Sequence, residues 1–313
     1  MSEQLDAERV AIAAQTLVID EATARVVTAL SGAGVDTILL KGAGIAHWFY
    51  DNGDVRAYDD SDLLVDPAGM AVAEELLATL GFVPVTPPER RAAHAWVWIH
   101  PDERVEFDLH RTLQGATKGD RDVWDVLNAE TASIPLMSVT VRILNRPASA
   151  VHIALHAAHH GVAKSKPSGD LTRAVARLTD DEWHAAAAVA ERLGAMPAFA
   201  AGLRLLEPGR RIADELRLPT AAPAAVALSV ASAPPMALAM EQLANAPGLR
   251  AKGALAVRRL APPARWMRAF YPLARRGTGG LVAAYALRAI LLVARAGPEL
   301  AVWLRTRRAS GPR

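Results

Sequence analysis

The sequence predicts an α/β (α+β) protein in two parts, a mixed-sheet domain over residues 1–146 and a mostly helical domain over residues 147–313. Short β-favouring runs alternate with helical segments in the first part, whereas Ala- and Leu-rich helical segments follow one another after Pro147. A length of 313 residues suits two domains of ordinary size. Hydrophobic residues make up 51% of the chain and charged residues 22%, which supplies a core and excludes a disordered chain.

The first part opens with a helix and continues as short strands separated by turns. Residues 3–30 carry Ala, Val and scattered charges without Pro or Gly, which predicts an amphipathic helix. Shorter helices are expected at 45–50 and at 69–80, the second ending at Gly81. The apolar, β-favouring runs predict strands at 37–40, 61–65, 82–85, 95–99, 104–109 and 139–144. A turn signal between the fourth and fifth of these runs indicates a hairpin.

The second part is predicted to be helical almost throughout. Helical segments are expected at 149–161, 170–178, 180–193, 197–206 and 236–308. The Ala- and Pro-rich stretch 219–235 fits either a linker or a loosely helical loop. Breaks in the last helical segment are expected at 262–263, 277–280 and 297–298, where Pro or Gly interrupts the pattern.

Composition also narrows the class of protein. The chain has no cysteine, which excludes disulfides, thiolate metal sites and a cysteine nucleophile. The first ten residues include acids where a signal peptide would be basic and then apolar. No stretch of about 18 apolar residues lacks a charge, so no transmembrane segment is expected. We therefore expect a soluble, cytoplasmic protein.

The pattern richest in chemistry is an acidic pair at the start of a predicted strand. Side chains two residues apart on a strand share a face, so Asp60 and Asp62 would project together about 7 Å apart. Two such carboxylates repel each other unless a cation lies between them, and Mg²⁺ prefers oxygen ligands. The alternative is an acidic turn in which Asp59 or Asp60 caps backbone amides.

Two further motifs favour the metal interpretation. Lys41 and Gly42 follow a predicted strand and precede a predicted helix, an arrangement that can bind phosphate, although the spacing is not that of a Walker loop. On a later strand, Glu106, Asp108 and His110 alternate and so share one face. A third carboxylate would allow two metal ions to be bridged.

Together these motifs resemble the uncharacterised nucleotidyltransferase family of the DNA polymerase beta superfamily. The resemblance implies a nucleotidyltransferase-like mixed sheet followed by a helical domain, and transfer of an NMP group from a nucleoside triphosphate such as ATP. It implies Mg²⁺ or Mn²⁺ as cofactor, with the same three residues as metal ligands and catalytic residues. These three residues are Asp60, Asp62 and Asp108, and the residues implied to hold the nucleotide phosphates are Lys41, Gly42, Ala43 and Arg56.

The resemblance leaves the acceptor open among a small molecule, RNA and a protein hydroxyl. Two positions depart from the family pattern: Ser61 stands where an apolar residue is usual, and Ala43 follows Gly42 where Ser or Gly is common. Both departures keep open a second interpretation, a non-catalytic module that binds a nucleotide on the same fold.

Several residues outside the motifs have more than one interpretation. His152, His156, His159 and His160 lie on one helical face and could pack, contact the nucleotide or substrate, or bind a metal. Arg56 could reach a triphosphate or neutralise the nearby acids. Residues 170 and 173, an Asp and an Arg one helical turn apart, could pair with each other or face the cleft. These alternatives stay open at the level of sequence.

The C-terminal segment is strongly basic. Residues 250–313 contain fourteen Lys or Arg and one acid, a net charge of +13, whereas the remainder carries −11. Arg288 and Arg295 lie on one face of the very apolar segment 281–304. Such a helix can pack on a neighbour, lie on an anionic membrane as a peripheral contact, or meet RNA.

Overall fold

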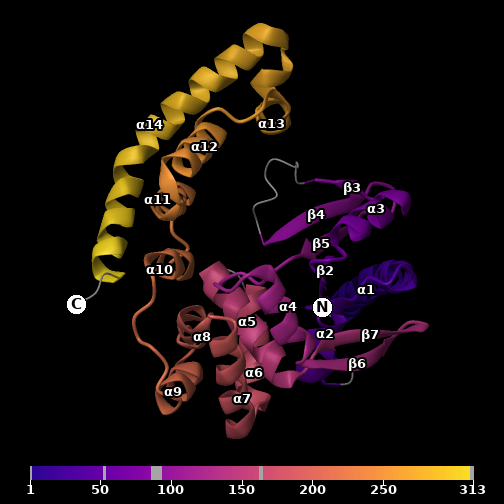
Figure 1. Cartoon of the computed structure of the whole chain (residues 1–313). Helices are drawn as coiled ribbons and strands as arrows, with labels where there is room; N and C mark the ends of the chain where they lie inside the picture. The colour runs from indigo at the N-terminus through magenta and orange to yellow at the C-terminus, as the bar shows by residue number, and fades with distance from the viewer. Residues whose placement is uncertain (1, 52–53, 86–93, 162–164, 311–313) are drawn as a thin grey trace. The chain divides into compact units, whose positions relative to one another are not determined.

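The computed structural model describes residues 2–51, 54–85, 94–161 and 165–310 (Figure 1). The chain forms two compact units, Met1–Thr220 and Ala221–Arg313. The expected boundary at 146/147 falls where the sheet gives way to helices, but that point lies inside the first unit. Helices α5 to α9 therefore belong to the same compact body as the sheet.

The first unit is built on a mixed seven-stranded sheet with the order β3-β4-β5-β2-β1-β7-β6. Its strands are β1 (Thr37–Leu39), β2 (Asp60–Val65), β3 (Val83–Pro84), β4 (Ala95–His100), β5 (Val105–His110), β6 (Thr131–Leu136) and β7 (Val139–Leu144). Two pairings are parallel, β1 with β7 and β2 with β5. The other neighbouring strands pair antiparallel. The parallel β2–β5 pair is the part of the sheet that carries the acidic motifs.

One face of the sheet is covered by α1 (Ser2–Gly32), beside which α3 (Met70–Thr79) packs. Ile19, Val26 and Leu30 of α1 are buried in one core with Leu63 of β2 and Phe107 of β5. Because side chains alternate along a strand, the neighbouring residues of β2 and β5 project from the opposite face. That second face is where the polar side chains of both strands lie.

Helices follow the sheet directly. They are α5 (Arg146–His160), α6 (Ser165–Arg177), α7 (Asp180–Arg192), α8 (Met196–Leu203) and α9 (Glu207–Glu215); α2 (Ala43–Phe49) and α4 (Asp120–Asn128) lie between strands. Helices α6, α7 and α8 all pack on α5. A Cβ atom at Gly202 of α8 would lie 2.0 Å from the Ala154 carbonyl oxygen of α5, so only glycine permits this approach.

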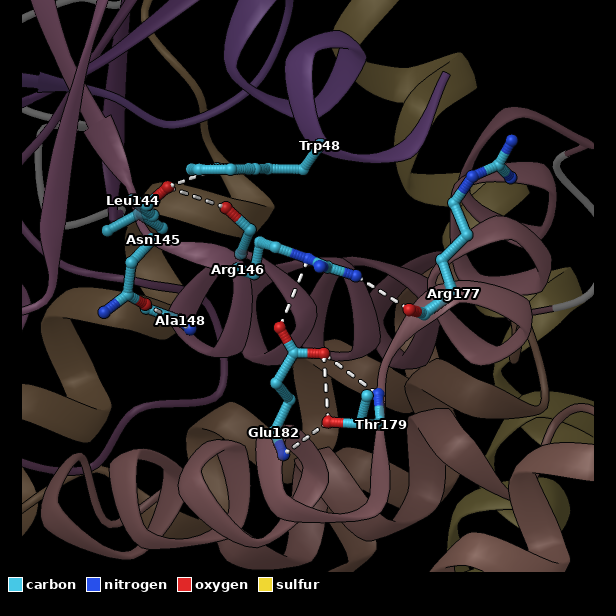
Figure 2. Close-up of polar contacts among 9 residues, drawn as sticks. Trp48, Leu144, Asn145, Arg146, Ala148, Arg177, Thr179 and Glu182 are labelled. Carbon is cyan, nitrogen blue, oxygen red and sulfur yellow. Dashed lines mark hydrogen bonds and ion pairs between the residues drawn. The ribbon is translucent and has the colours of Figure 1, made fainter. Parts of the chain in front are cut away.

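Polar contacts tie the start of α5 to the elements around it (Figure 2). Trp48 of α2 donates to the Leu144 carbonyl at the end of β7, and the Asn145 side chain caps α5. Arg146 donates to the Arg177 carbonyl at 2.7 Å and pairs with Glu182 at 3.3 Å. Since Glu182 also completes the capping box of α7, sheet and helices share one network.

The second unit is entirely helical within the residues that the structure describes. It contains α10 (Ala224–Val230), α11 (Pro235–Asn245), α12 (Gly248–Leu260), α13 (Ala264–Phe270), the 3₁₀ turn η3 (Pro272–Arg275) and α14 (Gly277–Ser310). The long helix α14 packs against η3, α10, α11 and α13. Met267, Ala274 and Ala284 form its small buried core.

The predicted fold class is confirmed, and most predicted elements are present with shifted ends. Three elements were not predicted: the strand β6 and the helices α4 and α9. The expected break at 297–298 is wrong, because α14 continues through Pro298. The expected break at 277–280 lies at its first residue only: Gly277 has a positive φ and begins α14. Of the two expectations for residues 219–235, the loosely helical one describes the stretch better, since the short helix α10 forms within it.

Candidate active site

The acidic residues of the two central strands face one another across the parallel β2–β5 pair. Asp60 lies opposite Glu106, and Asp62 lies opposite Asp108. The alternation of strand side chains puts all four carboxylates on the sheet face away from α1. His110 shares this face at the end of β5. The structure therefore gathers the strand acids that the sequence pattern singled out.

The serine between the paired aspartates lies on the other face. Ser61 is buried, and its hydroxyl is 2.9 Å from the hydroxyl of Thr23 on α1. The Thr23 hydroxyl also donates to the Ile19 carbonyl within the same helix. This departure from the family pattern thus bears on the packing of α1 and not on the acidic face.

Asp62 is the most enclosed of the four acids. Its Oδ1 accepts a hydrogen bond from Lys41 Nζ at 2.6 Å and lies 2.9 Å from His110 Nε2. Burial alone would raise the pKa of Asp62, but the Lys41 ammonium and His110 hold it well below its usual range. Asp62 is therefore a buried carboxylate whose ionised form is favoured by its two partners.

The neighbouring acids are shifted in the opposite direction. Burial, followed by the charge of Asp62, raises the pKa of Asp108 to about 6. The same two causes raise the pKa of Asp60, and burial with the charge of Asp60 raises that of Glu106. Crowded carboxylates of this kind hold protons more tightly because their charges repel. A cation bound among them would relieve this repulsion.

One group of side chains has the proximity that a metal ion needs. Asp62, Asp108 and His110 each offer a ligand atom, and these atoms all lie within 4.8 Å of one another. Asp62 Oδ2 and Asp108 Oδ1 are buried without a hydrogen-bond partner. Oxygen atoms left unsatisfied in this way fit a divalent cation. Asp60 lies outside this group, but it lines a cavity that Asp108 and His110 also line.

The Lys-Gly turn contributes its lysine to the cavity. Lys41 follows β1, and the hydrogen bond from the Leu40 amide to the Asp62 carbonyl holds the two strands together beside it. Gly42 has a φ of 57° and precedes α2, and a Cβ there would lie 3.4 Å from the Tyr58 ring. Among the described residues that line the cavity, Lys41 appears but Gly42 and Ala43 do not.

Arg56 is bound to a helix rather than to the strand acids. Its Nε and Nη2 donate to the two oxygens of Asp170 on α6, at 2.9 and 2.7 Å. Tyr50 donates to the same carboxylate at 2.8 Å. Both side chains of the ion pair are almost fully buried, at 3% and 2% exposed. Arg56 Nη1 has no hydrogen-bond partner, and Arg56 lines the cavity.

The two charged residues at positions 170 and 173 do not pair with each other. Asp170 pairs with Arg56, and Arg173 pairs with Asp54 at 2.9 Å. The Arg173 guanidinium also lies 4.1 Å from the centroid of the Tyr50 ring. Both residues of α6 therefore hold the segment that leads into β2.

The cavity has a volume of about 470 Å³ and is bounded by groups of distinct charge. Its acids are Asp59, Asp60 and Asp108; its bases are Lys41, Arg56 and Lys166; and its histidines are His94, His110, His152, His156, His159 and His160. All four histidines of α5 that the sequence singled out thus line one wall. Their metal role finds no support among the described residues, since only His110 joins the group with metal-ligand proximity.

Three histidines of the cavity have lowered pKa values, which favours their neutral form. Burial, followed by the charge of Lys41, lowers the pKa of His152 to about 3, and the same two causes lower that of His156 further. Burial and the charge of His110 lower the pKa of His94 to about 4. Both ring nitrogens of His152 are buried without a hydrogen-bond partner. Neutral imidazoles can donate and accept hydrogen bonds without adding positive charge.

Sequence reasoning missed three polar residues of the cavity, His94, Gln114 and Lys166. His94 directly precedes β4, Gln114 lies in a loop and Lys166 lies in α6, so no sequence spacing connects them. His110 was named in the sequence only for sharing a face with Glu106 and Asp108, whereas in the structure it belongs to the group with metal-ligand proximity. The alternation of Glu106, Asp108 and His110 was the signal available for this role.

Residues 1–208 match the profile of a family described as "Uncharacterised nucleotidyltransferase". The chain belongs to this family. The match covers the whole sheet and α5 to α8, including every residue of the acidic face. The resemblance inferred from the motifs is confirmed, as is the nucleotidyltransferase fold class.

Comparison with known proteins adds two similar structures. The chain is 16% identical to the antibiotic-resistance factor ANT(2'')-Ia, with a TM-score of 0.42 over 59% of this chain and 95% of the other. It is 13% identical to an antigenic nucleotidyltransferase-like protein from Paracoccidioides brasiliensis, with a TM-score of 0.41 over 63% and 91%. No curated protein matches. The family assignment therefore rests on residues 1–208.

Proposed function

We propose that this member of the nucleotidyltransferase family is a metal-dependent enzyme that moves an NMP group from a nucleoside triphosphate to an acceptor hydroxyl or phosphate. The observation that supports it most is the pair of buried, unsatisfied carboxylate oxygens, Asp62 Oδ2 and Asp108 Oδ1, on facing strands. Asp62, Asp108 and His110 would hold Mg²⁺ or Mn²⁺, with Asp60 on the same face. A bound divalent ion would neutralise triphosphate charge and stabilise the attacking and leaving oxygens.

The bases around the cavity would bind the triphosphate. Lys41 lies against Asp62, and Arg56 keeps one unpartnered nitrogen, Nη1, after its two bonds to Asp170. Lys166 reaches the rim, 3.6 Å from Asp59. Gly42 and Ala43 do not line the cavity, so they would contribute only by forming the turn that presents Lys41. These groups position the phosphates, as phosphoryl transfer generally requires.

Asp108 would act as the base. The acceptor oxygen attacks the α-phosphorus, the bond to the bridging α–β oxygen breaks, and pyrophosphate leaves. The acceptor hydroxyl loses its proton, and Asp108 would receive it from its position on β5 opposite Asp62, at the edge of the cavity. Asp62 is the weaker base of the two, since Lys41 and His110 hold its pKa well below its usual range.

The test is release of pyrophosphate from each of the four NTPs with Mg²⁺ or Mn²⁺, with labelled nucleotide followed into protein, RNA and small-molecule fractions. Asp62→Asn and Asp108→Asn should each lower turnover by at least about a hundredfold. Glu106→Gln is the matched control, because Glu106 shares the face but lies outside the metal-ligand group. The control should retain most of the activity.

Two results would overturn the proposal. Turnover that survives both asparagine variants would remove the carboxylates from the mechanism. Nucleotide binding without turnover in any fraction would favour a non-catalytic nucleotide-binding module on the same fold. Folding of each variant is checked by thermal unfolding, because Asp62 is also half of a buried ion pair.

A further inference from the structure

The second unit, residues 221–313, has a charge far from zero. It holds fourteen Lys or Arg and only two acids, a net charge of +12. Both acids are already engaged: Glu241 accepts from the Trp303 indole at 2.8 Å, and Glu299 accepts from the Met236 amide at 3.0 Å. The unit therefore presents almost purely positive charge to its surroundings, which attracts an anionic partner.

The inner side of α14 is fixed to the other helices of this unit. Arg288 donates to the Arg259 carbonyl at 2.7 Å and lies 5.0 Å from the centroid of the Trp266 ring. Tyr285 donates to the Pro262 carbonyl. Together with the contacts of Glu299 and Trp303, these bonds extend along most of the helix. They determine which side of α14 faces outward.

That outward side is apolar instead of polar. It carries side chains spaced three, four or seven residues apart, the spacings that place them on one stripe of a helix. We call this stripe the outer face; its residues are Val282, Ala286, Ile290, Val293, Leu300 and Leu304, all of them exposed. Ile290 is 65% exposed and Val293 77% exposed. A water-facing helix side normally carries polar residues, so the outer face lacks its partner.

Basic residues stand at both ends of the outer face. Arg275 and Arg276 precede α14, and Arg307 and Arg308 occupy its last turn. By length and composition α14 could cross a membrane, and only 6% of its most apolar 18-residue window is buried. Insertion across the bilayer would however bury Arg288 and pull it from its partners. An apolar stripe with basic ends is instead typical of a helix that lies in the membrane interface.

We propose that the outer face of α14 lies on the surface of an anionic lipid bilayer, with Val282 to Leu304 entering the interface and the flanking arginines contacting lipid phosphates. RNA fits the observations less well, because the stripe between the basic ends offers neither hydrogen-bonding nor stacking side chains to a nucleic acid. The inference does not depend on the proposed catalytic activity, since it rests on the second unit alone.

The experiment is co-sedimentation of the full chain with vesicles made of two parts phosphatidylcholine to one part phosphatidylglycerol, compared with phosphatidylcholine alone. Binding is expected for the anionic vesicles and should weaken as salt rises. The double variant Ile290→Asp/Val293→Asp should partition at least about tenfold less. The matched control is Val10→Asp/Val72→Asp, which adds the same charge at exposed helical valines of the first unit and should bind like wild type.

A second variant separates charge from apolar contact. Arg276→Gln/Arg308→Gln should weaken binding at low salt while leaving the helical circular dichroism unchanged. The proposal is overturned if wild type does not co-sediment with anionic vesicles, or if the outer-face variant binds them as strongly as wild type does. It is also overturned if the chain binds RNA in a filter-binding assay but does not bind vesicles. The same holds if size exclusion with light scattering shows that wild type is a dimer and the outer-face variant a monomer.

Discussion

The buried ion pair between Arg56 and Asp170 gives the sharpest test of the structure. Its side chains are 3% and 2% exposed, and they share two hydrogen bonds of 2.9 and 2.7 Å. Asp170→Leu would leave the Arg56 guanidinium buried without its counter-charge. Removing one partner of such a pair costs about 3–5 kcal/mol of folding free energy. The variant should therefore lose a large share of the stability of the first unit.

The double variant Arg56→Met/Asp170→Leu distinguishes the ion pair from simple loss of packing. Replacing both charges by apolar groups of similar volume removes the uncompensated charge, so this variant should be more stable than Asp170→Leu alone. Glu207→Gln serves as the control, since its pair with Arg210 is exposed and is worth about 0–1 kcal/mol.

Urea unfolding followed by tryptophan fluorescence measures these differences. Five of the seven tryptophans lie in the first unit, so the signal reports mainly on it. The reasoning is refuted if Asp170→Leu costs less than about 1 kcal/mol, or if the double variant loses the sum of the two single losses.

Three further results are expected. Ser61→Ala should cost about 1 kcal/mol, because it removes the bond to Thr23, yet leave pyrophosphate release unchanged; a loss of turnover without a loss of stability would place Ser61 in the site after all. His152 has a folded-state pKa of about 3 and an unfolded value near 6.5, so below pH 6.5 the unfolded state takes up a proton that the folded state does not. Stability should thus fall by up to about 1.4 kcal/mol per pH unit for this residue as pH falls from 6.5 towards 3, and His152→Leu should flatten the urea midpoint measured across that range. Mn²⁺ at a hundred times its Kd should stabilise wild type by about 2.7 kcal/mol and raise its Tm, and equal stabilisation of Asp108→Asn would contradict the metal site.

Local pattern was enough to predict which acids share a face. Alternation along a strand depends only on neighbouring residues, so the sequence could predict that Asp60 and Asp62 share a face of one strand and that Asp108 and His110 share a face of another. The register that puts Asp62 opposite Asp108 joins residues far apart in the chain, and nothing local encodes it. The same holds for Arg56 and Asp170, which are 114 residues apart.

The misplaced elements also have physical reasons. β6 contains Pro135, which argues against a central strand, but β6 lies at the edge of the sheet, where a missing amide is tolerated. Pro298 was expected to end a helix, yet α14 extends on both sides of it. The contacts of Glu299 and Trp303 just beyond that proline hold the helix to α11. Tertiary contacts here override the local preference.

The Arg56–Asp170 pair also decides how the molecule can be divided. A fragment that ended at Arg146 would keep every strand and every acidic residue of the site, and by sequence it would look like a complete catalytic module. It would also leave the Arg56 guanidinium without its counter-ion, because Asp170 lies on α6. A shortened or fused variant that is to keep this ion pair must therefore contain both the sheet and α6. The smallest fragment that preserves the surroundings of the site is larger than the sheet that carries its acids.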